Sequence, residues 1–224
     1  MLWIGARTTV NPFYVQEIAS ALKGVDIPVL VKNPIHPELG LWLGAIERLS
    51  KSGIKKIAAV HRGFYSHTKS AYRNDPKWEL PIRLKEEFND MPIICDSSHI
   101  AGNPFLIKEI SQTSIDLNFD GLMIESHWNP DNAWSDAKQQ VTPGHLVEIM
   151  KDLKVRKKTT HEEAYRHTLY TLRTQIDVVD QTLLDTLGKR MRVAQEIGSL
   201  KLKNNVAVLQ NKRWNEILGK MILE

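Results

Sequence analysis

Five short apolar runs recur along the first two thirds of the chain, and they predict five β-strands. The runs are rich in Val, Ile, Leu and Ala and lie at residues 2–6, 29–32, 57–61, 93–96 and 121–126. Within each run apolar residues occupy consecutive positions rather than alternate ones. That pattern is typical of a parallel sheet whose faces are covered by helices.

Helical patterns fill the intervals between these runs, and the alternation predicts a (βα)n architecture. The predicted helices lie at residues 13–22, 40–51, 82–89 and 104–113. A TIM barrel repeats this unit eight times over ~250 residues, and its chemistry lies at the carboxyl ends of the strands. With five strands, the pattern fits either a smaller open sheet or the last five units of a barrel.

The pattern changes after Met150, where a charged segment at 153–161 predicts a linker. Thr160 and Glu163 then have the spacing of a helix-opening capping box. From residue 169 to residue 197 apolar positions recur every three or four residues, which predicts one helix of about 40 residues and ~60 Å. We expect its apolar stripe to pack against a partner chain. A turn at Asn204 and Asn205 leads to a second predicted helix at 207–223.

Composition adds limits on compartment and partners. The chain has 224 residues and a single cysteine, Cys95, which rules out an internal disulfide and suits a reducing cytoplasm. No apolar run approaches the ~20 residues of a membrane span, and the N-terminus lacks the features of a signal peptide. We therefore predict a cytoplasmic protein without membrane contact, and we expect Cys95 to be a core residue.

Charge is unevenly distributed along the chain. Residues 1–150 carry 15 Lys and Arg against 17 Asp and Glu, whereas residues 151–224 carry 15 against 9. The basic segment could bind nucleic acid, an acidic partner or an anionic small molecule, or it could be a solvated helix face. Aromatic interleaving and a nucleic-acid-binding module are missing, so we expect no nucleic-acid partner.

Two kinds of side chain stand at the predicted strand ends. Cations suit phosphate and carboxylate oxygens, and mixed nitrogen and oxygen donors suit a divalent transition metal. The cations are Arg7, Lys32 and Arg62, and the metal-type ligands are His99, Glu125 and Asp136.

The motifs that carry these residues resemble successive strand ends of DAHP synthase, most closely the compact bacterial type I beta subfamily. They are Ile-Gly-Ala-Arg-Thr-Thr at 4–9, Val-Lys-Asn-Pro at 31–34, His-Arg-Gly at 61–63, Asp-Ser-Ser-His at 96–99, Ile-Glu-Ser-His at 124–127 and Ser-Asp-Ala-Lys-Gln-Gln at 135–140. The resemblance covers nearly all of residues 1–150. It implies a TIM barrel and the condensation of phosphoenolpyruvate with erythrose 4-phosphate.

The resemblance also implies residue roles. Phosphoenolpyruvate would be held by Gly5, Ala6, Arg7, Lys32 and Arg62. A divalent metal, manganese first and iron, cobalt or zinc as alternatives, would be held by His99, Glu125 and Asp136 and act as a Lewis acid. The family's cysteine ligand and its Lys-Pro-Arg-Thr motif have no counterpart here, so we expect residues 1–152 to be the later part of a barrel.

Residues 165–224 resemble the all-helical class of chorismate mutase. The matching segments are 172–176, 189–190, 198–203 and 211–214. The resemblance implies that Arg173, Arg190, Lys201 and Arg213 bind chorismate and hold the reactive conformer during its rearrangement to prephenate. The family's third helix has no counterpart, so we expect 162–224 to be the first part of that domain and the chain to be truncated at both ends, with little activity alone.

Helix geometry tests the second resemblance independently. Arg173 lies 28 residues before Lys201, roughly 42 Å away on a straight helix, so the two cannot serve one pocket in one chain. An exchanged arginine in a homodimer through the long helix would reconcile them, as in the family. Two functions stay open for this region: a catalytic mutase, or a sensor that binds chorismate or prephenate and regulates the barrel.

Overall fold

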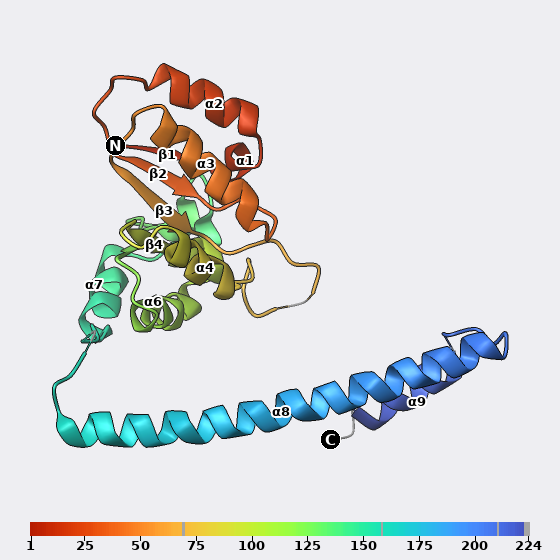
Figure 1. The fold of residues 1–224 in the computed structure, drawn as a ribbon. Helices are drawn as coiled ribbons and strands as arrows, with labels where there is room; N and C mark the ends of the chain where they lie inside the picture. The colour runs from red at the N-terminus through yellow and green to blue at the C-terminus, as the bar shows by residue number, and fades with distance from the viewer. Residues whose placement is uncertain (69, 158, 210, 222–224) are drawn as a thin grey trace. The chain divides into compact units, whose positions relative to one another are not determined.

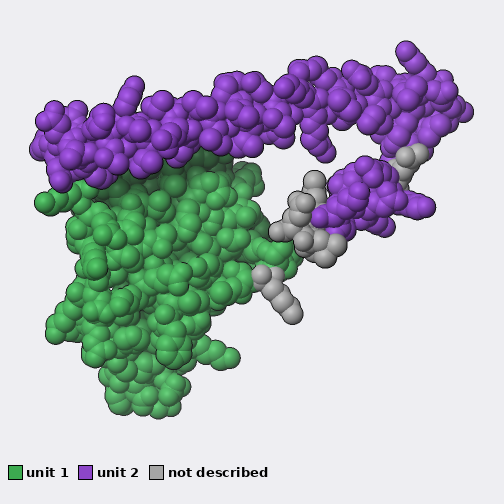
Figure 2. Space-filling view, turned by 90° about the horizontal axis from the view of Figure 1, so that it is seen from below, with its two compact units in different colours: residues 1–158 green, residues 159–224 purple. Residues whose placement is uncertain are grey.

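The computed structural model describes residues 1–68, 70–157, 159–209 and 211–221. It divides into two compact units, Met1–Lys158 and Thr159–Glu224, which Figure 2 shows in separate colours. Among the described residues, no helix is long and apolar enough to cross a membrane.

The first unit is built on a five-stranded parallel sheet in the order β1-β2-β3-β4-β5. Each strand pairs with the next one along the chain, as successive βα units require. Strands β2, β3 and β4 have the predicted bounds, while the outer strands β1 and β5 are two to three residues shorter than predicted. The strands are β1 (Leu2–Ile4), β2 (Val29–Lys32), β3 (Ile57–His61), β4 (Ile93–Asp96) and β5 (Gly121–Met123).

Helices connect the strands and cover the sheet (Figure 1). Four helical segments match predicted helices to within a few residues, and the fourth of these begins as a 3₁₀ turn. Three further α-helices were not predicted. The matched elements are α2 (Pro12–Ala21), α3 (Leu39–Lys51), α4 (Glu79–Glu87) and η1 (Pro104–Leu106) with α6 (Ile107–Asp116). The others are α1 (Ala6–Thr9), α5 (Ser97–Ala101) and α7 (Pro143–Asp152), and two 3₁₀ turns, η2 (Pro130–Asn132) and η3 (Ala137–Gln139), complete the unit.

Two apolar clusters hold these elements to the sheet. The first joins β1–β4 to α2, α3 and α4, and at its centre Trp42 is fully buried and donates its indole N–H to the Val31 carbonyl at 3.1 Å. The second joins β4 and β5 to α5, α6 and α7 and contains Cys95. Cys95 is buried, and burial raises the pKa of its thiol to about 12. The prediction that Cys95 is a core residue is confirmed.

The first part of the predicted linker makes contacts with α6. The backbone N–H of Lys154 donates to Gln112 on α6 at 2.8 Å, and the Arg156 Nε donates to Asp116 at 2.7 Å. Residues 153–157 lack helical structure, as predicted, and the backbone of Lys154 and the side chain of Arg156 contact α6.

The second unit consists of α8 (Glu163–Lys203), a turn, and α9 (Asn211–Met221). The 41-residue α8 confirms the predicted long helix. The predicted capping box is wrong, because α8 begins at Glu163, and the Thr160 hydroxyl accepts instead from the backbone N–H of Glu162 at 3.3 Å. The turn includes Asn205 at φ 54°. The start of α9 at 211 rather than 207 is a second correction, and its predicted end at 223 lies outside the described residues.

Candidate functional site

A cavity of about 550 Å³ lies at the carboxyl ends of β1, β2 and β3. Seven of the eight residues predicted to form the substrate and metal sites of the barrel line this cavity. The eighth, Glu125, lies beside the cavity in contact with His99. Its lining consists of Trp3, Gly5, Ala6, Arg7, Lys32, Ile35, Arg62, Tyr65, Arg73, Asn74, His99 and Asp136.

A larger cavity, of about 1010 Å³, lies at the opposite ends of the strands, around Pro28, Lys56 and Pro92. It is lined mainly by apolar and backbone groups and contains none of the predicted site residues. In open α/β architectures ligands bind at the carboxyl ends of the strands, so the smaller cavity is the candidate site.

Lys32, at the end of β2, points its ammonium group at a buried carboxylate. Its Nζ lies 2.8 Å from Asp96 Oδ2, and the Asp96 side chain is completely buried while that of Lys32 is 13% exposed. Burial by itself raises the pKa of Asp96, but hydrogen bonding and charge from His99 and Lys32 outweigh burial and leave the pKa below its ordinary value. Asp96 is therefore an ionised carboxylate that connects Lys32 to His99.

Arg62 follows β3 and is held at two points. Its backbone N–H donates to Asn33 Oδ1 at 2.6 Å, and its Nη1 donates to Asn74 Oδ1 at 3.2 Å. Burial lowers the pKa of the Arg62 guanidinium, which still remains protonated at neutral pH because its ordinary value is so high. A desolvated cation of this kind interacts strongly with an incoming anion.

Gly5 and Ala6 lie at the start of α1, on the same cavity. A Cβ built on Gly5 would meet no other atom within 4 Å, and Gly5 has φ −71°, which any residue adopts. The protein's own packing therefore does not require glycine here. A ligand that approaches the backbone closely would supply the missing reason.

His99, Glu125 and Asp136 form a compact group of possible metal ligands. One donor atom from each lies within 4.8 Å of the others. His99 belongs to the first turn of α5, where Asp96 caps the helix and accepts from the His99 backbone N–H at 3.2 Å. The backbone N–H of Glu125 donates to Ser98 Oγ at 2.9 Å. Asp136 precedes η3 with φ 50°, a left-handed conformation that Asp tolerates better than most residues.

The surroundings of these donors fit a bound divalent metal. A nitrogen donor with two carboxylates suits a transition metal, and each donor has an outer hydrogen-bond partner, as metal ligands ordinarily do. His99 Nδ1 lies 3.0 Å from Asp96 Oδ1, Gln139 Nε2 donates to Glu125 Oε2 at 2.7 Å, and Arg73 Nη1 donates to Asp136 Oδ1 at 2.7 Å. The Arg73 hydrogen bond and charge lower the pKa of Asp136, which favours its ligand form.

Sequence reasoning missed four residues of this arrangement: Arg73, Asn74, Asp96 and Gln139. Asp96 and Gln139 lie inside two of the motifs quoted above, three residues from His99 and Asp136 respectively. Their closeness in sequence to these proposed ligands could have identified them. Arg73 and Asn74 lie in the long connection between β3 and α4, which has no hydrophobic periodicity, so no pattern pointed to them.

In the described structure of this single chain, Arg173 lies 28 residues before Lys201 on the continuous α8, so the four predicted cations of the second unit cannot all line one pocket. Arg173, Arg190 and Lys201 lie along the continuous α8, and all project from an exposed helix. Lys201 Nζ donates to the Val208 carbonyl at 2.8 Å, and Arg213 Nη1 lies 3.3 Å from Glu216 on α9. The distance along α8 agrees with the geometric argument that Arg173 cannot share a pocket with Lys201.

Comparison with known proteins gives two family matches. Residues 1–162 match the DAHP synthetase I family, and residues 172–224 match chorismate mutase type II. A phospho-2-dehydro-3-deoxyheptonate aldolase of Thermotoga maritima is 29% identical over 154 residues, covering 69% of this chain and 44% of that protein.

Two solved structures are similar to the first part of the chain, each with 28% identity and covering 67% of it. One is a truncated 3-deoxy-D-arabino-heptulosonate 7-phosphate synthase from Thermotoga maritima, with a TM-score of 0.59 and 55% of that chain covered. The other is a phospho-2-dehydro-3-deoxyheptonate aldolase (DAHP synthase) of the same organism, with a TM-score of 0.57 and 43% covered. The chain thus spans about half the length of these relatives, and the predicted fold class, a partial parallel barrel followed by a long mutase-like helix, is confirmed.

Proposed function

The chain belongs to the DAHP synthetase I family through residues 1–162, and from this premise we propose that its cavity condenses phosphoenolpyruvate with erythrose 4-phosphate in aromatic amino-acid biosynthesis. The observation that carries the proposal is the cavity itself. Three cations on adjacent strand ends line the same space as the metal-type ligands His99 and Asp136. We assign residues 1–152 to this synthase domain, 153–161 to a linker and 162–224 to the mutase domain.

The cations have a direct role in this proposal. Arg7, Lys32 and Arg62 bind the carboxylate and phosphate of phosphoenolpyruvate, with Gly5 and Ala6 leaving room for the ligand against the backbone. Asp96 orients both Lys32 and His99 through its buried carboxylate. His99, Glu125 and Asp136 would hold the divalent metal, manganese in first place, which when bound would polarise the aldehyde of erythrose 4-phosphate.

Calorimetric titration with phosphoenolpyruvate tests the anion site. We expect Arg62→Gln to weaken binding at least tenfold, because a partly buried Arg contributes about 1.5–3 kcal/mol through charged hydrogen bonds. Arg83→Gln changes the net charge equally, but Arg83 is exposed on α4, so its affinity should match the wild type. Equal affinity in the wild type and Arg62→Gln would contradict the proposal. DAHP formation with erythrose 4-phosphate and Mn²⁺ then tests turnover.

For the second unit we propose rearrangement of chorismate to prephenate, with Arg173, Arg190, Lys201 and Arg213 binding the dianion. The match of residues 172–224 to chorismate mutase type II supports this. Disappearance of chorismate is the assay, and we expect Arg190→Gln to reduce kcat/KM at least a hundredfold because it removes a fixed cation at the developing charge. Tight prephenate binding without turnover would favour the sensor function instead.

A homodimer through α8 completes the proposal. Its apolar side chains are 49–59% exposed at Leu172, Ile176, Val179, Leu183, Leu187, Met191 and Ile197, whereas a helix of this amphipathic pattern normally buries its stripe. Sedimentation should show a dimer that Leu183→Glu dissociates, while Gln181→Glu adds the same charge on the opposite face and should not. A monomeric wild type at high concentration would contradict this proposal.

We also propose a cytoplasmic location. The single cysteine is free and buried, which suits a reducing compartment. Cell fractionation with an antibody against the chain tests this, and recovery in a secreted fraction would contradict it.

A further inference from the structure

Two neighbouring residues, Arg73 and Asn74, contact or adjoin every metal-type ligand of the candidate site. They lie in the connection between β3 and α4, far from the ligands in sequence. We propose that they are positioning residues: Arg73 fixes the two carboxylate ligands, and Asn74 joins the anion-binding arginine to the histidine turn. The inference rests on the proposed metal site and extends it to two residues that are not among the proposed metal ligands.

Arg73 acts on both carboxylates from one terminal nitrogen. Its Nη1 donates to Asp136 Oδ1 at 2.7 Å and also to Gln139 Oε1. The amide of Gln139 in turn donates through Nε2 to Glu125 Oε2 at 2.7 Å. Arg73 therefore orients Asp136 directly and Glu125 through Gln139, and each carboxylate keeps a second oxygen for a metal.

Asn74 acts on the other side of the site. Its Oδ1 accepts from Arg62 Nη1 at 3.2 Å, and its Nδ2 donates to the His99 carbonyl at 2.6 Å. Asn74 is only 7% exposed, so the loss of either hydrogen bond would leave a buried polar group unpaired. One amide thus fixes the spacing between the anion-binding cation and the helical turn that carries the histidine ligand.

The backbone holds this dipeptide in place. The backbone N–H groups of Arg73 and Asn74 both donate to the Ile100 carbonyl, at 3.0 and 3.2 Å. Two glycines with positive φ make room for the side chains. A Cβ on Gly63 would lie 2.8 Å from Asn74 Cβ, and a Cβ on Gly102 would overlap Arg73 Cβ. The connection is therefore seated by tight packing against the α5 turn, as a positioning role requires.

Mn²⁺ titration of the full chain without substrates tests the role of Arg73, read by the electron paramagnetic resonance of free Mn²⁺. Two effects of Arg73→Gln have opposite signs. Loss of a positive charge beside the site favours a bound cation, whereas loss of positioning disfavours it. We expect positioning to dominate and Mn²⁺ affinity to fall about 10- to 100-fold. Arg73→Lys keeps the charge with a shorter side chain and should fall between Arg73→Gln and the wild type.

The controls separate positioning from folding. Arg83→Gln changes the net charge equally on an exposed helix and should bind Mn²⁺ as the wild type does. The melting temperature in EDTA should agree among these variants, because the Arg73 side chain is half exposed. Asn74→Ala should weaken binding of inorganic phosphate about fivefold, the loss expected for one hydrogen bond, while Arg83→Gln should leave phosphate affinity unchanged.

The outcomes distinguish the two proposals. Mn²⁺ binding by Arg73→Gln as tight as by the wild type, or tighter, would overturn the role of Arg73. Unchanged phosphate affinity in Asn74→Ala would overturn the role of Asn74. If the wild type itself binds no Mn²⁺, the proposed metal site fails and the positioning role of Arg73 fails with it, whereas binding of phosphoenolpyruvate would still be tested on its own.

Discussion

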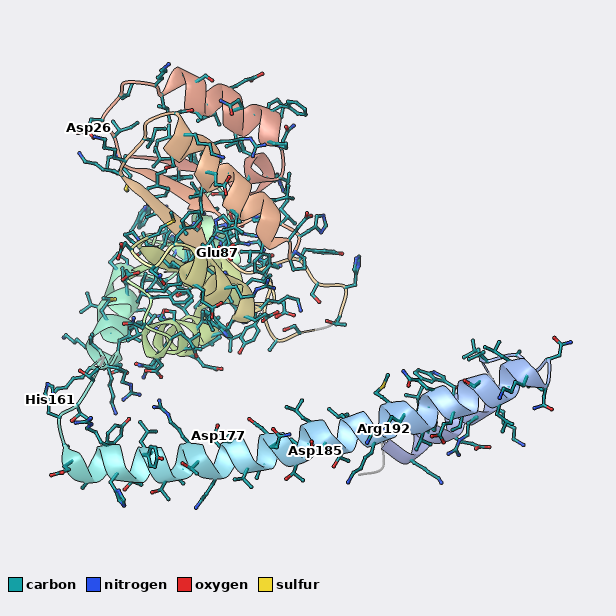
Figure 3. All side chains as sticks on the ribbon, viewed as in Figure 1. Asp26, Glu87, His161, Asp177, Asp185 and Arg192 are labelled. Atoms are coloured by element: carbon teal, nitrogen blue, oxygen red, sulfur yellow. The ribbon has the colours of Figure 1, made fainter. Side chains whose placement is uncertain are left out.

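The two units of this protein use apolar residues in opposite ways. In the first unit, apolar side chains from five strands and their helices form two buried clusters. In the second, every residue of α8 lies within the described part of the chain, and none is buried. Figure 3 shows side chains projecting all round α8, including the labelled Asp177, Asp185 and Arg192. The first unit therefore buries its apolar residues within itself, whereas the apolar stripe of α8 is exposed in the single chain.

The sharpest test of this difference compares one aromatic residue from each region. Trp42→Ala removes a fully buried indole and should lower the free energy of unfolding of the first unit by about 3–5 kcal/mol. Tyr170→Ala removes a side chain that is 71% exposed on α8 and should change stability by about 0.5 kcal/mol or less at low protein concentration. Urea denaturation of both variants makes the measurement, and equal losses would contradict the comparison.

Two histidines allow the pH dependence of unfolding to be compared between a buried and an exposed site. His61 is fully buried among Trp42, Phe64, Trp78 and Phe119, and among the described residues neither of its ring nitrogens has a well-formed hydrogen bond. Burial lowers its pKa to about 3, although the backbone of Pro76 and the charge of Asp96 oppose this shift. Between pH 6.5 and about pH 3 the unfolded chain binds a proton that the folded protein does not, so stability falls as pH falls, by about 1.4 kcal/mol per pH unit.

His61→Leu should remove this dependence, which amounts to about 3 kcal/mol at pH 4. His161, labelled in Figure 3, is exposed in the second unit, and His161→Leu is the matched control for removal of a histidine. Denaturant titrations at a series of pH values make the comparison. An equal pH dependence of stability in the wild type and in His61→Leu would show that His61 accepts a proton in the folded state.

Glycine substitutions should have opposite signs in the two units. Gly102 has φ 69° and no space for a Cβ beside Arg73, so Gly102→Ala should destabilise the first unit by about 1–3 kcal/mol. Gly198 lies inside α8 with no atom within 4 Å of its Cβ position, so Gly198→Ala should stabilise the helix by about 0.5–1 kcal/mol. Thermal unfolding followed by circular dichroism measures both, and a shift of the same sign in both variants would contradict the distinction.

The smallest effect concerns reactivity rather than stability. Cys95 is the single cysteine of the chain, and its buried thiol has a pKa of about 12. A disulfide reagent at pH 8 should therefore not modify the native protein, while the denatured protein should react within minutes because its thiol returns to a pKa of about 8.5. The reaction reports on the first unit alone, and fast labelling of the native protein would show that its core opens locally.

Much of the fold could be predicted from the chain, because apolar periodicity depends on neighbours that are close in sequence. The cores of all five strands and the single long helix were predicted in this way, and β2, β3 and β4 have the expected bounds. The errors are local ones. The predicted capping box fails because the Thr160 hydroxyl accepts from the backbone N–H of Glu162, before α8 begins.

The sequence by itself determined the residue types and the edge of the sheet at which they meet. Parallel strands place their carboxyl ends together, so Arg7, Lys32, Arg62 and His99 had to lie close to one another. The tertiary structure alone decided how they are held. Asp96 bridges Lys32 and His99, and Arg73 donates to Asp136, which lies 63 positions later in the sequence. Such contacts form when long loops close. Packing between distant elements sets the geometry of these loops, so the contacts leave no periodic pattern in the sequence.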